Sequence, residues 1–293
     1  MIGPGVGRPQ VLKSPLTVYT PESPLRRPGE FVRDMTSDLW ASRDLAWRLF
    51  VRDLSAQYRT SLLGYVWVFL PPLVASVPFI YLNSAGVVRM GTTPIPYAAY
   101  AMVSATIWQT FVDALNSPLR NVNAARSMLT RINFPREAIL VSGLMQVGFT
   151  FVVRLALVIA VFAAFALKPP ATSPLFLIGM ISIALTGFTI GLALTPLGVL
   201  YGDVQHSLPI ASTFLMLITP VLYPVPSSGL GATVVSWNPL TPLITTTRDW
   251  LTTGTAAQQL AFFVVSAVTV TLLLAAWVLY RLALPHLVAR LGN

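Results

Sequence analysis

The chain has 293 residues, of which 55% are hydrophobic and only 10% are charged. Because about a quarter of the residues in a typical soluble domain are charged, this composition excludes a purely soluble protein and predicts that lipid covers most of the surface. The net charge of +9 suits basic residues that flank membrane spans and meet anionic headgroups, so we predict no nucleic-acid partner. The chain has no cysteine, which excludes thiolate ligands.

The N-terminal region divides into a tail and a helix. Residues 1–37 contain many Pro and Gly and no apolar stretch of the kind found in a signal peptide, which predicts a disordered or extended cytoplasmic tail. Residues 38–61 carry an apolar and a basic stripe at helical spacing, which predicts an amphipathic helix in the membrane interface. The alternative is a surface helix of a soluble N-terminal domain. The apolar stripe is Trp47, Phe50, Val51, Leu54 and Tyr58, and the polar stripe is Asp44, Arg48, Arg52, Ser55 and Arg59.

Six long apolar runs follow, so the predicted fold class is all-α: a polytopic membrane protein with six transmembrane helices over residues 62–293. Of the 19 Lys and Arg residues, nine precede the first run, four lie within 117–137 and two follow residue 279. Since cytoplasmic loops carry the excess of Lys and Arg, both termini should be cytoplasmic. The runs are 62–82, 97–116, 138–167, 175–200, 208–223 and 260–279.

Two of these runs contain residues that lipid does not favour. The second has a stripe on one helical face, composed of Tyr97, Tyr100, Ser104, Trp108 and Phe111. The two tyrosines also fit an aromatic belt at the membrane surface, and Trp108 fits either a pathway or tight helix packing. The third run contains Arg154, for which Asp113 is the candidate partner. The predicted depths of these two residues differ, which counts against the pair.

Two connecting segments are also informative. The basic segment 117–137 contains a short predicted helix, roughly 121–130, and is longer than a simple connection requires; we expect a docking element there. Residues 225–255 are apolar but interrupted by Pro and Gly, which predicts short re-entrant or external helices between the fifth and sixth spans.

The chain lacks the sequence patterns of an enzyme or a motor. No G-x-x-x-x-G-K-[ST] segment occurs, and the two histidines, His206 and His286, are far apart. Asp113, Asp203 and Asp249 are isolated. We therefore predict no catalytic residues, no metal site and no cofactor bound by this chain, and we expect its energy source to be elsewhere.

Four short motifs, given in chain order at the end of this paragraph, make the chain resemble the membrane subunit of bacterial polysaccharide ABC exporters. These exporters move lipid-linked O-antigens, teichoic acids, capsules and galactan. Gly202 departs from the family, where arginine commonly precedes the aspartate. The arginine-rich, lysine-poor composition favours the actinobacterial galactan exporter within that class. The motifs are 52–67 with Leu63-Gly64, then Asn133-Phe134-Pro135-Arg136-Glu137, then Tyr201-Gly202-Asp203-Val204 followed by 219–223, and finally Trp237-Asn238-Pro239-Leu240 with Arg248-Asp249 downstream.

The resemblance implies half of a transporter in the bacterial inner membrane. Two copies of the chain would line one channel for a polyprenyl-pyrophosphate-linked polysaccharide, and two copies of a separate subunit would bind ATP and Mg. We assign substrate entrance to Tyr58, Arg59, Leu63 and Gly64, with Arg59 meeting either the lipid pyrophosphate or ordinary headgroups. The predicted channel residues are Trp67, Tyr100, Ser104, Trp108 and Phe111, and the predicted contacts with the ATP-binding subunit are Asn123, Arg126, Arg131, Phe134 and Arg136.

Other functions fit parts of the same pattern. Within the transporter class, the alternative is an ABC permease for drugs or small lipids. From other classes, the alternatives are a membrane enzyme acting on polyprenyl phosphate, which needs clustered acids or histidines, and a channel or scaffold that works without ATP. Co-purification of an ATPase separates these possibilities best.

Overall fold

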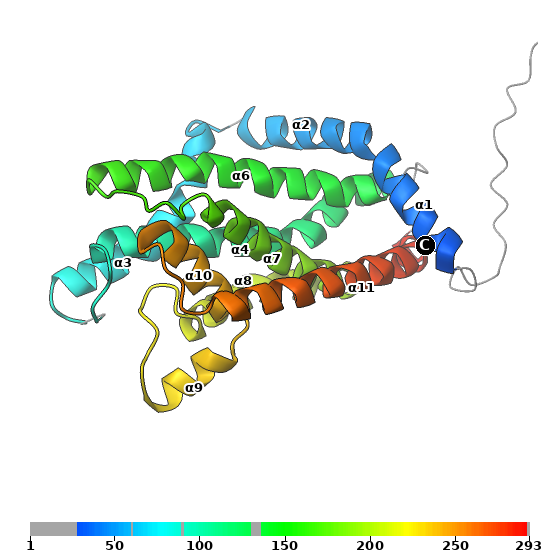
Figure 1. Cartoon of the computed structure of the whole chain (residues 1–293). Helices are drawn as coiled ribbons and strands as arrows, with labels where there is room; N and C mark the ends of the chain where they lie inside the picture. Colours follow the sequence, from blue (N-terminus) through cyan, green and yellow to red (C-terminus); the bar gives the residue numbers. More distant parts are fainter. Residues whose placement is uncertain (1–27, 60, 89–90, 130–135, 292–293) are drawn as a thin grey trace, which may run out of the picture.

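The computed structural model describes residues 28–59, 61–88, 91–129 and 136–291, and every regular element in these ranges is a helix. The bundle is elongated, with α1 and the C-terminal end of α11 at one end and α9 and α10 toward the other (Figure 1). The α-helices are α1 (Pro28–Ala41), α2 (Arg43–Arg59), α3 (Leu70–Ser84), α4 (Tyr97–Ala124), α5 (Arg126–Leu129), α6 (Glu137–Ala164), α7 (Leu175–Leu200), α8 (Gly202–Ile218), α9 (Gly229–Trp237), α10 (Leu240–Thr252) and α11 (Gln259–Leu291), and a 3-10 helix, η2, spans Gly64–Val68.

Three of the described helices are long and apolar enough to cross a membrane, namely α6, α7 and α11. They coincide with the third, fourth and sixth predicted runs. The remaining runs fall on α3 and α8, which have 15 and 17 residues, and on α4, which has 28 residues but is largely buried by its neighbours. The all-helical class is confirmed, and the count of six spans stays a prediction.

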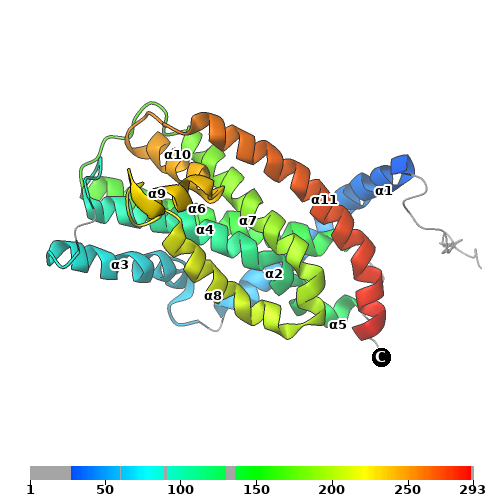
Figure 2. The same ribbon diagram turned by 90° about the horizontal axis from the view of Figure 1, so that it is seen from below.

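The centre of the bundle is the pair α4 and α7, which the other long helices surround (Figure 2). Small residues allow this close approach, as is common between helices in membranes. A Cβ atom on Gly187 would lie 2.5 Å from the backbone oxygen of Phe111, and one on Gly191 would collide with the backbone oxygen of Leu115. The two backbones are therefore in direct contact along one face of α7.

The N-terminal segment is more helical than we predicted. Residues 28–37, expected in the extended tail, belong to α1, and the predicted helix 38–61 is divided between α1 and α2, with Ser42 between them. Residues 1–27 lie outside the described part. On α2, Phe50 is buried against α6 while Trp47 and Val51 are exposed, so only part of the apolar stripe is covered. The position of α2 in a membrane interface stays a prediction.

One arginine near the C-terminus joins three helices. Arg281 on α11 donates to Asp38 of α1 at 2.5 Å and to Glu137, the first residue of α6, at 2.8 Å. Arg281 thereby joins α11 to α1 and to the start of α6.

Two short helices, α9 and α10, occupy the segment in which interrupted helices were predicted. They differ in burial: α9 has one buried residue, Val235, whereas most of α10 is buried against α7, α11 and α4. A Cβ on Gly179 of α7 would meet the side chain of Thr247 of α10. Because neighbouring helices cover α10, its four buried threonines and Arg248 do not have to face lipid.

Candidate functional site

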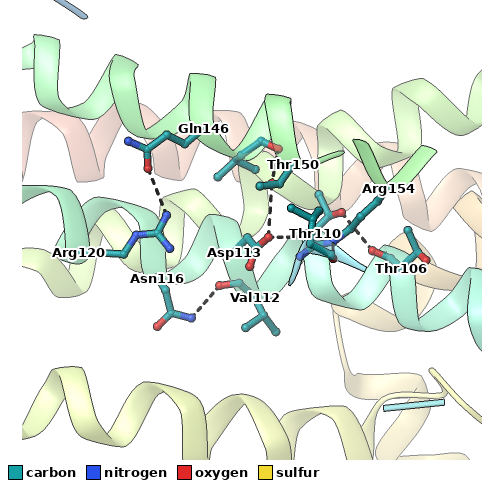
Figure 3. Close-up of polar contacts among 11 residues, drawn as sticks. Thr106, Thr110, Val112, Asp113, Asn116, Arg120, Gln146, Thr150 and Arg154 are labelled. Atoms are coloured by element: carbon teal, nitrogen blue, oxygen red, sulfur yellow. Dashed lines mark hydrogen bonds and ion pairs between the residues drawn. The ribbon is translucent and has the colours of Figure 1, made fainter. Parts of the chain in front are cut away.

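A row of polar side chains lies between α4 and α6 (Figure 3). Asp113 and Arg120 come from α4, and Gln146, Thr150 and Arg154 come from the antiparallel α6. Arg154 Nη1 lies 2.6 Å from Asp113 Oδ2, Thr150 Oγ1 donates to the same oxygen at 3.5 Å, and Arg120 donates to Gln146 at 3.4 Å. The row therefore contains one tight ion pair and several looser contacts.

Arg154 is the anchor of this row. Its side chain is 3% exposed, and a buried guanidinium needs partners to offset the loss of water. Besides Asp113, it has the backbone carbonyl of Val68 in η2, to which Nε donates at 3.1 Å. Arg154 thus connects α6 to α4 and to the segment before α3.

The depth comparison that counted against this pair was wrong. It placed the end of the second predicted span at residue 116, whereas α4 continues to Ala124. Asp113 consequently lies well inside the helix, and it reaches the level of Arg154 on α6. The helix continues because polar residues such as Ser117 and Asn121 are buried against α6.

A cavity of about 170 Å³ opens beside the polar row. Its walls come from α2, η2, α3, α4 and α6. The row also continues beyond it to α2, because Gln146 donates to Asp53 at 3.5 Å and Asp53 pairs with Arg52 at 2.8 Å. The polar lining residues are Gln57, Asp113, Arg120, Gln146, Thr150 and Arg154, and the aromatic one is Trp67.

The predicted entrance residues lie at the exposed join between α2 and η2. Gly64 has a φ of +50°, a left-handed conformation that glycine adopts without strain, and its N–H donates to the Ser61 hydroxyl at 3.0 Å. Leu63 is exposed, and so is Arg59 at the end of α2. The side chain of Tyr58 lies outside the described part. The entrance role of all four stays a prediction.

Four of the five predicted channel residues are buried inside the protomer. Tyr100, Ser104, Trp108 and Phe111 are at most 2% exposed, and the rings of Trp108 and Phe111 lie 5.1 Å apart. Only Trp67, at 52% exposure, is open, and it lines the cavity described above. In this conformation the stripe packs the core of the protomer; its role in a pathway stays a prediction.

The sequence pattern singled out Arg248 without indicating what it does. Its side chain is buried and lies over the ring of Tyr100, 4.2 Å from the centroid, a favourable cation–π position. It donates to Ser104 at 3.3 Å and to the backbone oxygen of Pro220 at 3.1 Å. Burial lowers the pKa of Arg248 and raises that of Asp249, and each charge partly opposes the other's shift. Through its hydrogen bonds to Ser104 and Pro220, Arg248 connects the turn after α8 to α4.

The predicted docking segment differs from expectation in its secondary structure. Residues 117–124 belong to α4, and the separate helix α5 covers only Arg126–Leu129. Asn123 donates to Gln205 of α8 at 2.8 Å, and Arg126 donates to the backbone oxygen of Val199 in α7 at 2.8 Å. Arg136 is half-buried just before α6. Arg131 and Phe134 lie outside the described residues. Contact with an ATP-binding subunit stays a prediction for all five.

Among the residues that the structure describes, no group of three or more His, Cys, Asp or Glu side chains is placed to hold a metal ion. The side chains that line the cavity offer hydrogen-bonding groups, charges and one aromatic face.

No protein-family profile matches the chain. Among curated proteins, the O-antigen export system permease protein RfbA of Myxococcus xanthus is 27% identical over 247 residues, which is 83% of this chain and 93% of that protein. Two proteins of the same name from Klebsiella pneumoniae are each 24% identical, over 70% and 69% of this chain and 78% of each relative. The resemblance carried by the four motifs is thus confirmed: over most of its length, this chain is similar to the permease subunits of O-antigen ABC exporters.

Proposed function

We propose that the chain is the transmembrane half of an ATP-driven exporter that moves a polyprenyl-pyrophosphate-linked polysaccharide from the cytoplasm across the inner membrane. The observation that carries this proposal is the similarity to an O-antigen export permease over 93% of that relative's length. Three helices able to cross a membrane support it.

Two copies of the chain form the channel in this proposal. Side chains of α3 and α8 support it, because both helices expose large apolar residues that lipid or a second copy can cover. The most exposed of these are Val74, Tyr81, Ile210 and Phe214. A polymer too wide for the closely packed core of one protomer requires a pathway between protomers.

Two copies of a separate ATP-binding subunit drive transport in this proposal, since the chain itself lacks a phosphate-binding loop. They dock on the face formed by α5 and the α7–α8 turn. The hydrogen bonds from Asn123 to Gln205 and from Arg126 to Val199 join the ends of α4, α7 and α8 at this face. A displacement of the face by the ATP-binding subunit would therefore be transmitted to three helices. Leu200 and Tyr201 at the turn are exposed.

The orientation follows from the basic residues. We place α1, α5 and the end of α11 on the cytoplasmic side, because fifteen of the 19 Lys and Arg residues precede the first apolar run, lie within 117–137 or follow residue 279 in the sequence. Arg59 at the end of α2 would then meet the lipid pyrophosphate, for which the guanidinium fork is suited.

Affinity purification of the full chain from its native membranes tests the proposal. We expect an ATP-hydrolysing subunit to co-purify, and the complex in vesicles to move extracted polyprenyl-pyrophosphate-linked polysaccharide only when ATP is present. Export of small lipids or drugs without the polymer would favour the other permease class. Polymer movement without any ATPase, or chemical conversion of polyprenyl phosphate by the purified chain, would overturn the proposal.

A further inference from the structure

The cavity beside the α4–α6 polar row combines an aromatic wall with several hydrogen-bonding groups. Trp67 lines one side, and Gln57, Asp113, Arg120 and Gln146 line the others. A pocket with an apolar surface and a few converging polar groups is the usual form of a small-ligand site. Its volume of about 170 Å³ has room for roughly a dozen water-sized atoms, about the size of one sugar ring with its hydroxyl groups.

The charges in this cavity favour a neutral ligand over a phosphate. Arg154 is already occupied by Asp113 and by the carbonyl of Val68, so its charge is balanced where it lies. Asp113 is the carboxylate of that ion pair, so the pair as a whole adds no net charge to the lining. Of the two arginines that line the cavity, only Arg120 is exposed. One exposed guanidinium provides little electrostatic attraction for a doubly charged pyrophosphate.

The hydrogen bonds around the cavity are ones that a ligand can replace. Arg120 to Gln146 and Gln146 to Asp53 measure 3.4 Å and 3.5 Å, which is long for hydrogen bonds of this kind. Asp113 uses Oδ2 for Arg154 and Thr150, and within the described part of the chain its Oδ1 accepts no hydrogen bond. Amide and carboxylate groups that can give up these long hydrogen bonds are able to bind the neighbouring hydroxyl groups of a sugar instead.

We propose that this cavity is a subsite for one uncharged sugar unit of the transported polysaccharide, with the ring stacked on Trp67 and its hydroxyls bound by Gln57, Asp113 and Gln146. The proposal rests on the proposed function, because it assumes that a glycan reaches this face. Trp67 presents a broad apolar surface to the C–H groups of a sugar ring, and the adjoining polar groups set its orientation. The subsite lies beside η2, and a sugar bound there contacts the segment that leads into α3.

Cysteine protection tests this subsite, since the chain has no cysteine of its own. We place one cysteine at Gln57→Cys, in the cavity, and a matched one at Ser55→Cys, two residues earlier on α2 and also exposed but outside the cavity lining. Each variant, assembled with its ATP-binding subunit in vesicles, is labelled with a water-soluble maleimide. The probes are polyprenyl-pyrophosphate-linked polysaccharide extracted from the source cells and polyprenyl pyrophosphate without sugar.

We expect the glycan-bearing lipid to slow labelling of Gln57→Cys about tenfold, to leave Ser55→Cys unchanged, and the sugar-free lipid to protect neither. Equal protection of Gln57→Cys by both lipids would assign the cavity to the lipid pyrophosphate and overturn the sugar subsite. Absence of protection in vesicles where the wild-type complex exports polymer would also overturn it while leaving the proposed function intact. Absence of both export and protection would overturn both.

A second measurement uses the aromatic wall. Trp67→Phe keeps a ring and should retain most of the affinity for the glycan-bearing lipid, whereas Trp67→Ala should raise its half-saturating concentration about tenfold. Equal half-saturation for the wild type and Trp67→Ala would remove the stacking role and, with it, the sugar subsite.

Discussion

Where α4 packs against α7, glycines bring the two backbones into contact, whereas the neighbouring edge of α2, η2 and α3 is joined to the bundle by side chains, both apolar ones such as Phe50 and the polar group around Arg154. Fourteen residues of α7 are buried. In α3 only Pro72 and Ser76 are buried, and in η2 only Val68 is buried. The first region is held by direct backbone contact, and the second by side-chain contacts that include the ion pair and hydrogen bond of Arg154. We infer that the edge is the part of the protomer that can shift while the centre stays fixed.

The largest expected effect comes from filling the contact between α4 and α7. Gly191→Ala places a methyl group against the backbone oxygen of Leu115, so the helices must separate, at a cost of about 3 kcal/mol. The midpoint of thermal unfolding in detergent should fall by roughly 5–10 °C. Gly148→Ala on α6 is the matched control, because no atom lies within 4 Å of the added Cβ, and it should be neutral. Equal behaviour of the two variants would contradict the close backbone contact.

A smaller loss should follow from removing the carboxylate that pairs with Arg154. Asp113→Ala leaves a buried guanidinium with one carbonyl partner, and the partial exposure of Asp113 limits the expected loss of stability to about 2 kcal/mol. The denaturation midpoint in detergent measures it. Removing both charges with Asp113→Ala and Arg154→Met should recover part of the loss. A double variant no more stable than the single one would argue that the carboxylate does not neutralise Arg154.

Accessibility compares the two regions directly. Ser104→Cys on the buried face of α4 should react with a water-soluble maleimide about tenfold or more slowly than Trp67→Cys at the edge, because the first site opens only through local unfolding. Labelling is followed with and without ATP. Rapid reaction of Ser104→Cys during ATP turnover would instead place the aromatic stripe in the transport pathway.

The smallest effect is expected at the exposed end of the edge. Arg59→Ala should reduce export at low substrate concentration about threefold, since one exposed contact between a guanidinium and a phosphate contributes little. Arg59→Lys keeps the charge but loses the fork of donors, and its export rate should lie between those of the wild type and Arg59→Ala. Normal export by Arg59→Ala at limiting substrate would leave Arg59 with no role beyond binding ordinary headgroups.

The apolar runs predicted the helical class and the approximate positions of the long helices, because burial in lipid or protein needs the same residues. The apolar runs gave the wrong helix ends where a helix is covered by other parts of the protein and not by lipid. α4 continues through Ser117 and Asn121, whose polar groups end the apolar run although they pack against α6. In the same way, the first predicted run began too early, since residues 64–68 form a separate 3-10 helix.

The site was predicted only in fragments for a related reason. Arg154 and Trp67 stood out by their chemistry, but Gln57 and Gln146 are ordinary polar residues in sequence, and only the crossing of α2, α4 and α6 brings them together. The periodic stripe on α4 correctly identified one face of a helix. Periodicity alone does not distinguish a face covered by Arg248 and α7 from one that lines a pathway.

The contacts of Arg281 also impose an order on biosynthesis. Asp38 lies 243 residues before Arg281, so α1 acquires this partner only when nearly the whole chain has been synthesised. Until α11 is in place, the carboxylates of Asp38 and Glu137 lack the guanidinium that joins them. The N-terminal helix is therefore among the first elements to be made, whereas its ion pair with Arg281 is among the last contacts to form, and a chain that stops before residue 281 lacks this link between α1, α6 and α11.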